Sequence, residues 1–71
     1  MEVLWYNSSS MSTLKELREK QFLTQGDLAE RSGIGRDTIN RLEKGYQKPT
    51  FSTIRKLATA LGVSPGDIDF S

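Results

Sequence analysis

The chain contains no cysteine and no histidine among its 71 residues. Without cysteine, neither a disulfide framework nor a thiolate zinc site can form, and without histidine the commonest general base and metal ligand is missing. No apolar run approaches the length of a membrane span, and the first residues lack the basic and then apolar pattern of a signal peptide. We therefore expect a cytoplasmic protein that is not an enzyme, binds no metal or cofactor and does not enter a membrane.

The length is that of one small domain, close to the size at which a single hydrophobic core is only marginally sufficient. The formal net charge is +1, which does not by itself point to nucleic acid as a partner. The charge distribution is more informative, because residues 36–48 hold four basic residues against two acidic ones. A mild basic excess is therefore concentrated in the middle of the chain.

Local signals divide the chain into about five helices, which predicts an all-α fold. Small polar residues mark the expected helix starts and glycines mark the ends. The expected starts are Thr13, Thr24, Gly35, Thr50 and Ser64, and the expected ends are Gly33, Gly45 and Gly62. Gly35 is the weakest of these N-caps because it has no side chain to accept a hydrogen bond.

Apolar residues within these segments recur at helical spacing, as in Ile54, Leu57, Ala58 and Leu61. The predicted core consists of Leu14, Leu17, Leu23, Leu28, Ala29, Ile34, Ile39, Leu42, Phe51, Ile54, Leu57, Ala58, Leu61, Val63, Ile68 and Phe70. Residues 1–10 do not fit the helical pattern, and a strand, an added arm and a disordered leader are all open interpretations. We therefore expect an N-terminal leader over residues 1–11 and a helical domain over residues 12–71.

The segment from Gln25 to Leu42 has the residue types of a helix-turn-helix at the required spacing. Ala29 lets two helices approach closely, and Gly33 supplies the positive φ that ends the first of them. Ile39 and Leu42 place one apolar edge of the second helix in the core. Its opposite face is then free to lie in a DNA major groove.

The face opposite Ile39 and Leu42 is polar on a helix expected over about residues 36–44. It carries Asp37, Asn40, Arg41 and Lys44, with Arg36 at its flank. Arginine pairs with guanine O6 and N7, asparagine with adenine N6 and N7, and aspartate accepts from cytosine N4. A solvated helix face would look similar, and the helix-turn-helix spacing is what favours base readout.

These features together resemble the Cro and phage-repressor-like helix-turn-helix family, often called the XRE family, over roughly Leu14 to Phe70. The resemblance rests on LREKQFLTQGDLAERSGIGRDTINRLEKG, on the loop YQKPT and on FSTIRKLATALGVSPGDI. It implies a compact five-helix bundle of the lambda-repressor-like type. It also implies a sequence-specific transcriptional regulator, commonly a repressor, that binds double-stranded operator DNA as a homodimer.

The resemblance also assigns roles to individual positions. The residues implied to read bases are Arg36, Asp37, Thr38, Asn40 and Arg41. The residues implied to contact phosphates are Gln25, Lys44, Lys48, Thr50 and Phe51, the last two through their backbone N–H groups. Arg18 and Glu43 match a family pair that forms a partly buried ion pair between the first and third helices. Gly35 stands where many relatives carry a phosphate-binding side chain, so one expected contact is missing.

A second interpretation is a protein-interaction module, because in some relatives the same fold serves as an antitoxin or as a bridging factor. The apolar N-terminus and the low net charge would suit such a role. If the chain instead binds DNA as a homodimer, the contact between its two copies could come from the leader or from the C-terminal Ile68 and Phe70. The operator sequence, the sign of regulation, the oligomeric state and any toxin or other protein partner are left open by the sequence.

Overall fold

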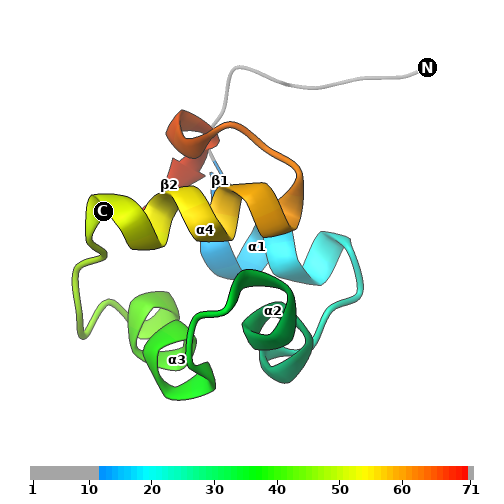
Figure 1. Cartoon of the computed structure of the whole chain (residues 1–71), viewed down its shortest axis with the longest axis horizontal. Helices are drawn as coiled ribbons and strands as arrows, with labels where there is room; N and C mark the ends of the chain where they lie inside the picture. Colours follow the sequence, from blue (N-terminus) through cyan, green and yellow to red (C-terminus); the bar gives the residue numbers. More distant parts are fainter. Residues whose placement is uncertain (1–11, 71) are drawn as a thin grey trace.

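The computed structural model describes residues 12–70, which form four α-helices, one 3-10 turn and two very short strands. The elements in chain order are β1 (Ser12–Thr13), α1 (Leu14–Lys20), α2 (Gln25–Ser32), α3 (Arg36–Lys44), α4 (Phe51–Leu61), the 3-10 turn η2 (Pro65–Asp67) and β2 (Ile68–Asp69). Figure 1 shows α2 and α3 on one side of α4, with the two strands on the other. The leader over residues 1–11 lies outside the described residues.

One contiguous core holds the helices together. Its buried members are Leu14, Leu23, Leu28, Ile39, Leu42, Leu57, Ala58, Leu61 and Ile68. Every helix contributes to this set, and α2 packs against both α3 and α4. The periodic apolar residues of each helix therefore face a common centre, as the sequence predicts.

The predicted starts of α1, α2 and α4 are confirmed by side-chain hydrogen bonds. Thr13 and Glu16 form a reciprocal capping box at α1, and Thr24 and Asp27 form one at α2. The hydrogen bonds with Thr24 lower the pKa of the Asp27 carboxyl below its ordinary value. Gly35 caps α3 without a side-chain hydrogen bond, which leaves this start the least supported of the four α-helices.

The predicted ends of α2, α3 and α4 are confirmed as well. The glycine after each helix has a positive φ, and the Gly33 N–H donates to the carbonyl of Ala29 at 2.9 Å. This left-handed conformation carries little cost for glycine and turns the chain sharply from α2 toward α3.

The prediction of five helices is wrong for the last segment. Residues 65–67 form only a 3-10 turn, and Ile68–Asp69 then pairs in parallel with Ser12–Thr13. Pro65 can begin a helical turn, but Gly66 has poor helix propensity and Ile68 is already extended, with φ −99° and ψ 125°. Ile68 is buried in this extended conformation, so the helix does not continue beyond Asp67.

The placement of Phe51 in the core is also wrong, because its side chain is 74% exposed. Phe51 is the first residue of α4 and lies one helical turn before the half-buried Ile54. The buried contacts of α4 come from Leu57, Ala58 and Leu61 farther along the helix.

Phe22 is the one non-glycine residue with a positive φ in the described part of the chain, at 58°, and its side chain is 94% exposed. A bulky residue gains nothing from packing here and carries the cost of the left-handed conformation. We expect Phe22→Gly to raise the free energy of unfolding by about 0.5–1 kcal/mol, as measured by urea denaturation. Tyr46→Gly, at an exposed position without positive φ, is the matched control and should give no gain. Equal effects of both variants would contradict the conformational explanation.

Candidate nucleic-acid interface

The pair α2 and α3 has the geometry of a helix-turn-helix. The chain leaves α2 at Gly33, crosses in three residues and enters α3 at Arg36. Ala29, in the helix before this turn, and Ile34, within the turn, are half-buried against the core. The small side chain of Ala29 and the left-handed Gly33 therefore hold α3 close to α2, as the residue spacing predicts.

The two faces of α3 differ as predicted. Ile39 is 0% exposed and Leu42 is 6% exposed. Away from this apolar edge, the exposed residues of α3 include Arg36, Asp37, Arg41 and Lys44, and Thr38 and Asn40 are half-buried. The structure therefore brings all five residues predicted to read bases onto one accessible helix, although their contacts with bases stay a prediction.

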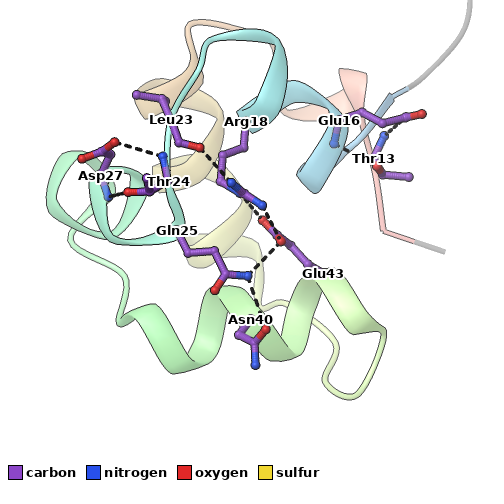
Figure 2. Close-up of polar contacts among 9 residues, drawn as sticks. All are labelled: Thr13, Glu16, Arg18, Leu23, Thr24, Gln25, Asp27, Asn40 and Glu43. Carbon is purple, nitrogen blue, oxygen red and sulfur yellow. Dashed lines mark hydrogen bonds and ion pairs between the residues drawn. The ribbon is translucent and has the colours of Figure 1, made fainter.

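A partly buried ion pair joins α1 to α3. Arg18 Nε donates to Glu43 Oε2 at 2.7 Å, and Arg18 Nη2 donates to Glu43 Oε1 at 3.1 Å. The side chains are 11% and 4% exposed, and Arg18 Nη1 also donates to the carbonyl of Leu23 at 2.8 Å. Hydrogen bonding to Glu43 raises the pKa of Arg18 above its ordinary value. This two-pronged contact, shown in Figure 2, confirms the predicted pair and fixes the position of α3.

Gln25 begins α2, but its side chain turns toward α3. Its Nε2 donates to Glu43 Oε1 at 3.0 Å and to Asn40 Oδ1 at 3.3 Å. Both amide hydrogens are thus used within the protein, and its carbonyl oxygen points away from Asn40 and Glu43 (Figure 2). A phosphate contact by this residue stays a prediction, and in this arrangement the donor would be the backbone N–H at the start of α2.

The remaining predicted phosphate contacts lie just after α3. Lys44 and Lys48 are exposed, and Lys44 Nζ lies 6.0 Å from the centre of the Tyr46 ring. Thr50 caps α4 by accepting from the Thr53 N–H at 3.2 Å. The first N–H groups of a helix lack partners within the helix, so those at the start of α4 can donate to an anion.

Two specific features are absent from residues 12–70, a group of side chains for a metal ion and a membrane-spanning helix. No group of three or more acidic side chains in this range is arranged to hold a metal ion. None of its helices has the length and apolar character that crossing a membrane requires.

Comparison with known proteins agrees with this geometry. A family model described as Helix-turn-helix matches residues 14–68. The chain belongs to this helix-turn-helix family. An uncharacterized HTH-type transcriptional regulator, y4dJ of Sinorhizobium fredii, is 42% identical over 53 residues, which cover 75% of this chain and 69% of that protein. The Cryptic phage CTXphi transcriptional repressor RstR of Vibrio cholerae is 38% identical over 52 residues, which cover 73% of this chain and 47% of that protein.

A solved structure shows the same fold. The restriction-modification controller protein C.AhdI from Aeromonas hydrophila superimposes with a TM-score of 0.74 at 39% sequence identity. The match covers 76% of this chain and 82% of that chain. The sequence similarity and the structural similarity therefore identify the same helix-turn-helix domain.

The link from Gln25 to Asn40 in this helix-turn-helix domain is not among the contacts that the sequence predicts. The sequence predicts a phosphate contact for Gln25 and base readout for Asn40, with no contact between the two. The two residues are 15 apart in the chain, and they meet because α2 packs against α3. Sequence spacing gives no signal for this contact, because either amide could equally face the solvent.

Proposed function

We propose that this chain is a sequence-specific repressor that binds operator DNA as a homodimer and inserts α3 into the major groove. Its family and its relatives establish the broader function, that of a DNA-binding transcriptional regulator. The proposed base-reading residues are Arg36, Asp37, Thr38, Asn40 and Arg41, and the proposed phosphate contacts come from Gln25, Lys44, Lys48, Thr50 and Phe51.

The observation that carries this proposal is the asymmetry of α3. Its apolar edge is fixed in the core by Ile39 and Leu42, and Glu43 is tied to Arg18 on α1. Its opposite face presents arginine and asparagine, which are the side chains that pair with base edges in the major groove. A rigid helix that presents such groups at the surface is suited to enter the groove as one body.

The proposed homodimer follows from the size of the interface. A single recognition helix contacts only a few base pairs, so two copies on half-sites about one helical turn apart supply the specificity that one copy lacks. Repression as the sign of regulation is supported by the name of the relative RstR, a transcriptional repressor.

The decisive experiment is a selection of binding sites from random double-stranded DNA, with the full chain and Arg41→Ala run in parallel. Enrichment of a short palindrome by the natural chain, and its loss with Arg41→Ala, is the expected result. No enrichment by the natural chain would contradict sequence-specific binding and favour the protein-interaction role. Enrichment of the same palindrome by both proteins would show that α3 does not read it through Arg41.

A further inference from the structure

The side chains that join α1, α2 and α3 form a chain of hydrogen bonds with a fixed direction. Glu43 is its centre, because its Oε1 accepts from both Arg18 Nη2 and Gln25 Nε2. An arginine can only donate, and a carboxylate can only accept. Next to this nearly buried carboxylate, Gln25 must therefore present its NH2 group rather than its carbonyl oxygen.

The fixed order of donor and acceptor also applies to the next hydrogen bond, from Gln25 to Asn40 on the outer part of α3. One hydrogen of Gln25 Nε2 faces Glu43, and the other is donated to Asn40 Oδ1. Figure 2 shows the Asn40 oxygen turned toward Gln25 and the Asn40 nitrogen turned away from the group. The outward end of Asn40 is therefore an NH2 donor.

We propose that Gln25 is a specificity-determining positioning residue, which orients Asn40 so that it reads base acceptors in the major groove. This inference rests on the proposed function, because it requires α3 to lie in the groove. An outward NH2 group meets two adjacent acceptors in guanine, O6 and N7, and one acceptor in thymine, O4, whereas in adenine the N7 acceptor lies beside the N6 amine, which is itself a donor. The two-bond pairing of asparagine with adenine is lost, because it requires Oδ1 to accept from adenine N6.

The usual pairing of asparagine with adenine predicts adenine at this position, and the hydrogen bonds of Asn40 reverse that preference. The ion pair on the inner side of α3 thus determines which base the outer side selects. Gln25 makes no base contact in this mechanism, and it affects the choice of base only through the orientation of Asn40.

The test is a binding-site selection with four full-length proteins: the natural chain, Asn40→Ala, Gln25→Met and Asn40→Asp. Asn40→Ala identifies the base position that depends on Asn40. Gln25→Met keeps the length of the side chain but removes both donors, so Asn40 is free to rotate. Asn40→Asp keeps the acceptor toward Gln25 and replaces the outward donor with an acceptor.

At the position that depends on Asn40, the natural chain should prefer guanine or thymine over adenine by about five- to tenfold. With Gln25→Met this ratio should fall to about two or less, and Asn40→Asp should shift the preference to cytosine or adenine, whose exocyclic amines donate. Circular dichroism checks that each variant is folded. If Gln25→Met does not fold, Asn40→Asp still tests the outward donor.

Three results would overturn the inference while the proposed function stands, because the natural chain would still select a palindrome. These are a preference of the natural chain for adenine at that position, no change at any position with Asn40→Ala, and an unchanged base preference with folded Gln25→Met. A merely structural role of Gln25 would lower the affinity for all sequences equally. Failure of the natural chain to select any sequence would instead overturn the proposed function, and this inference with it.

Discussion

Arg18→Met is expected to lower the free energy of unfolding by about 3–5 kcal/mol. The variant leaves the Glu43 carboxylate, whose side chain is 4% exposed, without its ionic partner, and an unpaired charge in such a site is strongly destabilising. For a domain of 71 residues, whose total free energy of unfolding is about 4–11 kcal/mol, this loss is a large fraction of the whole. Urea denaturation followed by circular dichroism measures it.

The double variant Arg18→Met with Glu43→Leu is the matched control. Removing both charges replaces the ion pair with apolar contacts, and such replacements are often neutral or stabilising. We expect the double variant to regain most of the stability lost by Arg18→Met. A loss below about 1 kcal/mol for Arg18→Met would show that water reaches the carboxylate freely, as it does at exposed ion pairs.

Arg41→Ala is expected to weaken binding to the selected palindrome by about five- to 150-fold per half-site, while the free energy of unfolding changes little. A two-bond contact between arginine and guanine contributes about 1–3 kcal/mol of discrimination, and the exposed Arg41 has no part in the core. Fluorescence anisotropy with labelled palindrome and with scrambled duplex measures the effect. Binding to the scrambled duplex should change much less.

Substitutions of one further arginine and one further lysine distinguish contacts with bases from general effects of positive charge. Arg55→Ala removes an exposed cation from α4, outside the proposed interface, and should change the affinity by less than about twofold. Lys48→Ala should weaken binding to both duplexes alike. It should also reduce the slope of log affinity against log salt concentration by about one, which corresponds to one lost phosphate contact. Equal losses for Arg41→Ala and Arg55→Ala would contradict base readout by α3.

The four α-helices and the inner and outer faces of α3 could be predicted from the sequence because their signals are local. A capping residue such as Thr24 and a left-handed glycine such as Gly33 act on their own backbone. The parallel pairing of β1 with β2 could not be predicted, because it joins residues at the two ends of the domain. Gly66 weakens a helix here, but no short-range pattern indicates that Ile68 pairs with Ser12.

Which residues lie on the accessible side of α3 could be predicted from the sequence, but not the orientation of their side chains. The spacing from Gln25 to Leu42 places Asn40 on the outer part of α3, and the structure agrees. Which end of the Asn40 amide faces outward depends on Gln25, Glu43 and Arg18, which lie on three different helices. That information exists only once the helices have packed together.

The pairing of Ser12–Thr13 with Ile68–Asp69 brings both ends of the described chain to one place. Thr13, Asp69 and Phe70 line one hollow together with Lys44 and Gly45 at the carboxyl end of α3. The paired ends therefore border the proposed phosphate contacts of Lys44 and the loop that follows it. A domain fused directly before Ser12 or directly after Phe70 would start beside this edge of the proposed interface, so the binding measurements above call for untagged protein.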